Sequence, residues 1–341
     1  MKKKINFKLC ISLLIILLIL FAVVSLLIGR YNISPYESFR ILLYKLRLPF
    51  IKKTWTDLQE SVVTTIRMPR IIVAIFVGAG LSVAGASFQG IFHNPLVSPD
   101  ILGVSASAGF GAALGIIIGS QTSSLVSIFA FTFGIIGVGS AYFLSRVHKT
   151  TPTVMMVLSG VVVSSLANAG ISILKYFADP LEQLPAITFW LMGSLDSVRL
   201  KEALICVPVI SVCLFTLFLL AFRIDLLSMG ENEAKSLGVR PERLKTLVIM
   251  ASTLISAMSV YICGTIGWIG LIIPHISRML VGPSYKKLLP TSALLGAMFL
   301  LLIDDIVRTI SESSLPLSIV ISLVGAPFFA MLLRKTKGEW I

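Results

Sequence analysis

Charged residues are scarce in this chain of 341 residues. Only 13% of its residues are Asp, Glu, Lys or Arg, whereas a soluble globular chain carries about 25%. Hydrophobic residues make up 56% of the chain, and the mean hydropathy is +0.95. This composition excludes an ordinary soluble protein. Because many apolar runs approach the roughly 20 residues that cross a bilayer, we predict an all-α polytopic membrane protein with one transmembrane domain over residues 1–341.

Cysteine and histidine are also rare. The four cysteines all lie inside apolar runs without CxxC spacing, which excludes a disulfide framework and a cysteine metal site. His93, His148 and His275 are scattered without ligand spacing, so we predict no metal site and no cofactor. Ser159 has no histidine base in the neighbouring pattern. We therefore predict no catalytic residues and no enzymatic activity.

A nucleotide-binding motif is missing as well. The chain has no GxxxxGK[ST] sequence, so ATP-driven work would need an ATPase on another polypeptide. The net charge of +13 does not indicate nucleic-acid binding, because no basic stretch is interleaved with stacking aromatics. Orientation in membrane lipid explains the basic residues better, since Lys and Arg gather in cytoplasmic loops.

Ten apolar segments are candidate membrane spans. They cover residues 9–28, 68–91, 101–118, 124–144, 153–174, 203–222, 245–263, 265–281, 288–307 and 315–333. The first is interpreted as a retained helix rather than a signal peptide, because its core is long and no A-x-A-like site follows. Ten spans place both termini on one side. The distribution of Lys and Arg predicts that this side is cytoplasmic, in a multi-pass protein of the cell membrane.

One charged stretch, "LLSMGENEAKSLGVRPERLK" (226–245), interrupts the apolar pattern. Ser228 with Glu231 three residues later has the spacing of a capping box. Gly238 is placed as the left-handed residue after a helix, with Val239 in contact with Ala234 in a Schellman arrangement. We therefore predict a short helix within 226–240, outside the membrane.

The surroundings of this short helix favour a docking role. Leu227, Ala234 and Leu237 recur at helical spacing and predict a small apolar face. Pro241 suits the first position of the next helix, and Glu242 suits its first turn. We expect the helix to bind a cytoplasmic partner; a solvated connector is the alternative.

Several stretches together resemble the FecCD-type permeases of ABC importers, which take up ferric siderophores, haem and cobalamin. The matching stretches are "RMPRIIVAIFVGAGLSVAGASFQGIFHNPLVSPDILGVSASAG" (67–109), "FWLMGSL" (189–195), "MGENEAKSLGV" (229–239), "IGWIGLIIPHISRMLVG" (266–282), "LLPTSALLGAMFLLLIDDIVR" (288–308) and "LVGAPFFAMLL" (323–333). They occur in family order over most of the chain. The chain departs from the family pattern at Trp268 and Ile269, at Ile303, and at Ser314 and Ser318.

The resemblance implies a fold, partners and a function. The fold would be that of the cobalamin-importer permease, a type II ABC importer with about ten transmembrane helices. The partners would be a second permease copy or a paralogue, cytoplasmic ATPase subunits and an extracellular or periplasmic substrate-binding protein. We expect import of an iron–siderophore complex, with cobalamin or haem as the alternative. A proton-coupled carrier is disfavoured because the acidic residues lie near span ends or in loops.

The resemblance also assigns roles to residues. The ATPase-coupling residues would be Ser228, Gly230, Glu231, Glu233, Ala234, Leu237 and Gly238. Exposed Arg67, Arg70 and Arg308 would pair with glutamates of the binding protein, although arginines at helix ends can also be membrane-interface anchors. Thr151 and Thr153 are candidates for an inner gate; the alternative is N-capping of span 153–174.

Two further local expectations concern the span ends. Asp304 and Asp305 lie four and three residues before Arg308, so either can pair with it. Pro95 and Pro99 in "HNPLVSPD" (93–100) break a helix twice, which predicts a sharp inner turn between the second and third spans.

Overall fold

The computed structural model describes residues 6–29, 31–45, 52–119, 124–146, 151–310 and 315–335, and these form helices joined by turns. The α-helices are α1 (Phe7–Leu27), α2 (Pro35–Lys45), α3 (Asp57–Ser61), α4 (Met68–Ile91), α5 (Val104–Ile118), α6 (Ser124–Ser145), α7 (Thr153–Phe177), α8 (Gln183–Leu191), α9 (Leu200–Leu227), α10 (Glu231–Ser236), α11 (Pro241–Cys263), α12 (Ile269–Val281), α13 (Tyr285–Ile310) and α14 (Leu317–Lys335). A π-helical segment, Val62–Arg67, joins α3 to α4, and a 3-10 turn, Pro99–Leu102, precedes α5.

Each of the ten predicted spans coincides with a helix, so the all-α polytopic fold is confirmed. Among the described residues, six helical stretches are long and apolar enough to cross a membrane: α1, α3 to α4 taken together, α6, α7, α9 and α11. Helices α2, α3 and α8 were not predicted. The expected inner turn lies between α4 and the 3-10 segment, where the Asn94 side chain accepts a hydrogen bond from the Leu96 amide (2.9 Å).

Helix α4 is the centre of the larger helical group. It packs against α13, α11, α9 and α12, and its residues are buried almost continuously from Pro69 to Ile91. Its small residues allow close backbone approach. A Cβ atom at Gly85 would overlap the Gly270 carbonyl on α12, and one at Gly78 would overlap the Gly296 carbonyl on α13. These glycines therefore set the separation of the helices.

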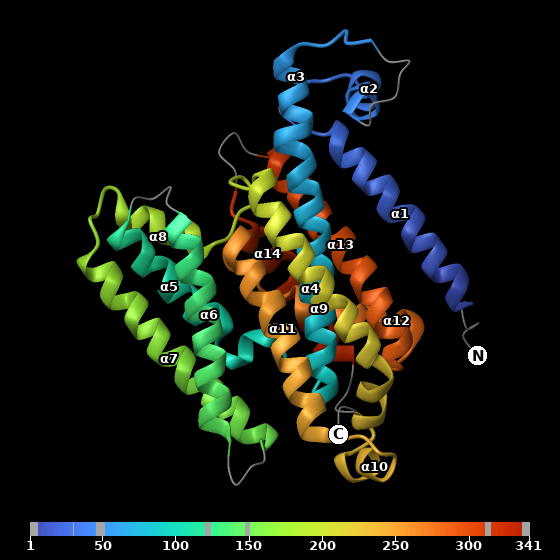
Figure 1. Cartoon of the computed structure of the whole chain (residues 1–341), viewed down its shortest axis with the longest axis vertical. Coiled ribbons are helices and arrows are strands. Elements are labelled where there is room, and N and C mark those ends of the chain that lie inside the picture. Colours follow the sequence, from blue (N-terminus) through green and yellow to red (C-terminus); the bar gives the residue numbers. More distant parts are fainter. Residues whose placement is uncertain are drawn as a thin grey trace.

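Helices α5, α6, α7 and α8 form a second group beside the first (Figure 1). A small apolar core that includes Ala108, Ala112, Ile116 and Ile187 lies inside this group. Contacts of α11 with α6 and α5 join the two groups.

The two ends of the bundle carry different elements. Helices α2 and α3 lie at one end and α10 lies at the other, while α1 runs along one side of the bundle (Figure 1). Ile33, Ile41, Trp55 and Val63 form a separate small core beneath α2 and α3. We refer to these regions as the α2 end and the α10 end.

Candidate functional site

The start of α10 differs from the sequence prediction. Helix α9 continues to Leu227, so residues 226 and 227 belong to it, and Ser228 follows its last turn. There the Ser228 hydroxyl donates to the Asp225 carbonyl (2.7 Å) instead of capping α10. The N-cap of α10 is Gly230, with φ of 139° and no side-chain cap. The predicted capping box is therefore wrong, because Ser228 is used at the end of one helix and not at the start of the next.

The end of α10 confirms the predicted Schellman arrangement. Gly238 has φ of 80°, and its amide donates to the Lys235 carbonyl (3.0 Å). The Val239 amide donates to the Ala234 carbonyl (2.9 Å), which is the pairing that defines the motif. Pro241 is the first residue of α11, also as predicted. The turn between α10 and α11 is thus fixed by local sequence.

The surface around α10 combines apolar and basic groups. Leu227 and Ala234 are buried, as their predicted apolar face requires, but Leu237 is 60% exposed. Leu237 instead lines a groove of about 670 Å³ between the end of α9 and the start of α11, together with Phe222, Arg240 and Arg243. Glu233 is exposed. The element therefore lies beside an apolar groove edged with arginine.

Lys245 fixes α10 to α11, a role that sequence analysis missed. Its side chain is buried and its ammonium group forms an ion pair with Glu231, while Glu242 lies 4.0 Å away. Lys245 lowers the pKa of the Glu231 carboxyl by hydrogen bonding to its charged form. Because Glu231 is engaged inside the chain, it positions α10. A lysine in the first turns of α11 was the only signal in the sequence.

The two threonines have different surroundings. Thr151 is buried and donates a hydrogen bond to Glu242 Oε2 (2.6 Å), which links the segment before α7 to α11. Thr153 is the first residue of α7 and is half-buried. The N-cap of α7 is Pro152, without a side-chain cap, so the N-capping alternative for these threonines is wrong. Thr151 therefore lies beside the start of α11, and Thr153 lies two residues further along the chain.

The three arginines at the α2 end are buried, with exposed fractions of 3% for Arg67, 6% for Arg70 and 8% for Arg308. The expectation that their guanidinium groups are exposed is therefore wrong. Arg67 donates to the carbonyls of Leu26 (2.7 Å) and Tyr31 (2.6 Å), at and beyond the end of α1. Burial of a charge is costly unless it is paired, and the folded chain supplies partners for each arginine.

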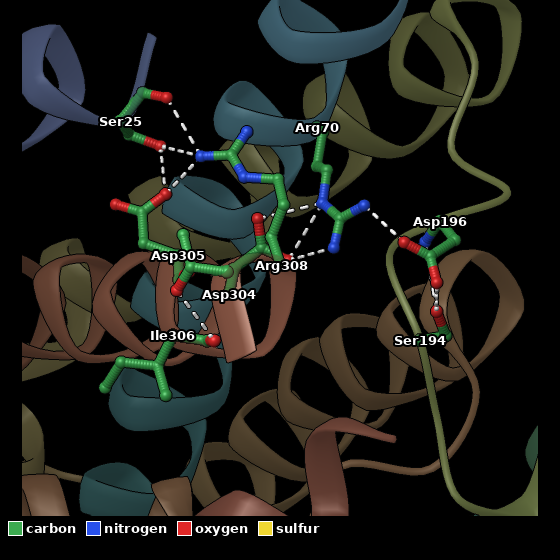
Figure 2. Close-up of polar contacts among 9 residues, drawn as sticks. Ser25, Arg70, Ser194, Asp196, Asp304, Asp305, Ile306 and Arg308 are labelled. Atoms are coloured by element: carbon green, nitrogen blue, oxygen red, sulfur yellow. Dashed lines mark hydrogen bonds and ion pairs between the residues drawn. The ribbon is translucent and has the colours of Figure 1, made fainter. Parts of the chain in front are cut away.

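Arg70 and Arg308 lie in two adjacent ion-paired groups (Figure 2). Arg70 Nε contacts both carboxylate oxygens of Asp304 (2.9 Å each), and Nη2 donates to Asp304 Oδ1 (2.7 Å). Arg70 also pairs with Asp196, in the loop after α8. No spacing in the sequence indicates the pair between Arg70 and Asp304, because 234 positions separate the two residues.

One of the two pairings expected for Arg308 is confirmed. It forms an ion pair with Asp305, and its Nη2 donates to the Ser25 carbonyl on α1 (2.9 Å). The Ser25 hydroxyl donates to Asp305 Oδ1 (2.6 Å). Asp304 points to Arg70 instead, because successive residues of a helix face different directions. Together these contacts connect α1, α4, α13 and the loop after α8.

The described part of the chain offers no ready metal site: within it, no group of three or more His, Cys, Asp or Glu side chains is placed to hold a metal ion. The arrangement is that of a helical membrane unit with one anchored, charged surface element at the α10 end. At the α2 end, in contrast, the charged side chains of Arg70 and Arg308 are paired within the chain.

This chain belongs to the FecCD transport family, whose model matches residues 16–335. It is therefore an ABC importer permease, and its all-helical fold is that of the type II importers. A solved structure of an inward-facing metal-chelate type ABC transporter is 39% identical, covers 95% of this chain and 98% of its own, and has a TM-score of 0.83. A structure of PsaBC from Streptococcus pneumoniae, 20% identical with a TM-score of 0.53 over 77% of this chain and 88% of its own, shares the fold.

Curated relatives carry different substrate names. The molybdate import system permease protein MolB of Haemophilus influenzae is 41% identical over 95% of both chains. A probable iron chelatin transport system permease of Helicobacter pylori is 38% identical over 94% of this chain and 96% of its own. The hemin transport system permease HmuU of Yersinia pestis is 29% identical over 99% of both. The family is one of transport permeases that work with ATPase and binding-protein partners.

Proposed function

We propose that this chain is the membrane subunit of an importer for an iron–siderophore complex. The observation that carries the proposal is the similarity to the inward-facing metal-chelate type transporter, at a TM-score of 0.83 and 39% identity. The relative named for iron chelatin supports the same substrate class. Molybdate is the second candidate, because the MolB relative is 41% identical over 95% of both chains. Cobalamin and haem are weaker alternatives within the same architecture.

Coupling to ATP hydrolysis is assigned in this proposal to the segment 226–240, centred on α10. Its exposed Glu233, Leu237 and Gly238 would contact the ATPase, while buried Ala234 and paired Glu231 hold the element against α9 and α11. A force applied to α10 would pass to α11 through Lys245 and the short turn at Gly238. Ser228 and Gly230 set the direction in which the chain leaves α9.

The α2 end would receive the external binding protein. Because Arg67, Arg70 and Arg308 are buried and paired, we assign them the role of holding this surface in shape. Thr151 and Thr153 are retained as inner-gate candidates. The exposed apolar residues of α7, such as Val154, Leu158 and Leu166, would face a second permease copy or a paralogue. Both termini would be cytoplasmic.

Uptake by the reconstituted transporter tests the substrate. The chain would be placed in proteoliposomes with its ATPase and binding protein, and ⁵⁵Fe-siderophore and ⁹⁹Mo-molybdate uptake would be measured with internal or external ATP as the orientation requires. We expect ATP-dependent uptake of the iron complex. Uptake of molybdate alone would contradict the iron assignment. Uptake that persists without ATP while the membrane potential is kept would contradict the importer mechanism.

Association with the ATPase tests the coupling segment. Glu233→Arg combined with Gly238→Pro reverses an exposed charge and removes the left-handed turn, since proline fixes φ near −65°. We expect loss of ATPase binding in a pull-down while the membrane domain keeps its thermal stability. Lys201→Glu, an exposed charge reversal at the start of α9, is the matched control. Unchanged binding of the double variant would mean that 226–240 is only a connector.

A further inference from the structure

A groove between α6 and α11 has an apolar part that the transport function proposed above does not use, while Arg243 and Thr151 at its polar end also belong to surfaces described above. It has a volume of about 280 Å³ and an almost wholly apolar lining that includes Ile135, Gly139 and Leu254. Toward the α10 end it meets a second hollow of about 390 Å³, and Tyr142 and Thr246 line both. The hydroxyl groups of these two residues are hydrogen-bonded (2.9 Å) where the hollows meet. The apolar groove is thus continuous with a polar hollow.

The polar hollow carries two exposed arginines. Arg146 directly follows the end of α6 at Ser145, and Arg243 lies in the first turn of α11. Glu242 also lines this hollow, but its carboxylate accepts a hydrogen bond from Thr151 (2.6 Å) and lies 4.0 Å from the Lys245 ammonium. The ion pairs found among the described residues do not include either arginine. The hollow therefore has positive charge to offer an anion.

The length of the groove matches one leaflet of a bilayer. From Arg146 to Ile135, and equally from Arg243 to Leu254, the distance along the helix is about 16 Å at 1.5 Å per residue. The hydrocarbon core of a bilayer is about 30 Å thick, so the groove extends through roughly half of it. The arginines would then lie at the headgroup level and the apolar part at the depth of the acyl chains.

The rim of the groove carries exposed apolar side chains, as a surface in contact with acyl chains would. Leu247 and Met250 on α11, which line the hollows, and Phe143 on α6, next to Tyr142, are large apolar residues that are exposed. At Gly139, inside the groove, an added Cβ atom would have no neighbour within 4 Å. The groove therefore has free space at a glycine and opens on an apolar face of the molecule.

We propose that this groove binds one anionic phospholipid. Its phosphate lies between Arg146 and Arg243, whose guanidinium groups match phosphate oxygens in a two-pronged geometry. Its acyl chain occupies the apolar groove between α6 and α11. Basic pockets between transmembrane helices at the cytoplasmic surface are known to suit acidic headgroups. The inference concerns lipid chemistry and is independent of the transported substrate.

Lipid titration followed by native mass spectrometry tests this site on the full chain purified in detergent. The probe is palmitoyl-oleoyl phosphatidylglycerol, and phosphatidylcholine with the same acyl chains is the neutral comparison. We expect about tenfold tighter binding of the first lipid, as two arginines near a headgroup allow. Arg146→Gln with Arg243→Gln should abolish that preference. Arg334→Gln, on α14 which packs against α12 and α13, should retain it.

Filling the groove separates the acyl chain from the headgroup. Gly139→Leu should weaken binding of both lipids several-fold without lowering thermal stability, because its side chain enters free space. Equal binding of the two lipids by the wild type, or inorganic phosphate binding as tightly as the lipid, would overturn the proposal. Disulfide cross-linking between two copies through Gly139→Cys would also overturn it, since a second copy would then cover the groove. None of these readouts depends on transport.

Discussion

The α2 end and the α10 end differ in the burial and pairing of their charged side chains. At the α2 end, Arg70 and Arg308 are buried against Asp304 and Asp305, and their charges are balanced inside the chain. At the α10 end, Arg240 and Arg243 are exposed along a groove, and Glu233 is exposed on α10 itself. Charges of the first kind hold helices together, whereas charges of the second kind are available to a partner. Mutations at the two ends should therefore separate stability from binding.

The largest effect is expected at the α2 end. Arg70→Met would leave Asp304 buried without its partner, and breaking a buried ion pair costs about 3–5 kcal/mol. Thermal unfolding in detergent should show a clear loss of stability. The double variant Arg70→Met with Asp304→Leu removes both charges and should recover much of the loss. Equal destabilisation by the single and double variants would show that the pair does not account for the effect.

A smaller effect is expected at the α10 end. Gly238→Val places a β-branched residue at φ of 80°, which costs about 1–2 kcal/mol because left-handed backbone disfavours side chains. Since an added Cβ would meet no atom within 4 Å, the cost is conformational and not steric. We expect faster amide hydrogen exchange in residues 231–240 and weaker ATPase binding, with unchanged stability of the membrane domain.

Gly238→Asn is the control for that substitution, because asparagine tolerates the left-handed conformation after a helix. It should keep most of the protection of α10. If Gly238→Val destabilised the whole domain as much as Arg70→Met does, the contrast between the two ends would be wrong.

The smallest effect concerns pH at the α10 end. Lys245 lowers the pKa of Glu231 below its usual value near 4.5. The ion pair therefore contributes its full stabilisation above that usual value and loses it as the pH falls through the lowered pKa. Because Glu231 is partly exposed, the contribution is about 1 kcal/mol or less. The protection factors of the α10 amides, which correct for the intrinsic pH dependence of exchange, should fall below pH 4.5 in the wild type and much less in Glu231→Gln. Parallel profiles of the two proteins would contradict this.

Local sequence predicted the features that depend on local contacts. The ten helices followed from apolar runs, and the turn at Gly238 followed from glycine, Val239 and Pro241, which act within a few residues. The same reasoning was wrong at Ser228, because the apolar pattern did not reveal that α9 continues to Leu227 and uses that hydroxyl.

Contacts between distant segments were not predictable in this way. Arg70 pairs with Asp304, which is 234 positions away, and Arg67 donates to the Leu26 carbonyl, which is 41 positions away. Neither spacing is one from which a contact can be predicted. Their position at membrane borders suggested exposure, whereas the fold covers them. Helix α8 was missed because nine residues with an internal proline fall below the length of a span.

The burial of α4 has a consequence for biosynthesis. This helix leaves the ribosome early, yet α13, against which Gly78 packs, and α12, against which Gly85 packs, are made about 200 residues later. Until then Ser82, which lies against Gly296, and Gln89, which is hydrogen-bonded to Gly270 and Arg278, lack these neighbours. Exposed, incompletely packed surfaces make folding intermediates vulnerable. Membrane assembly of this permease must therefore wait for the final third of the chain before its central helix is enclosed.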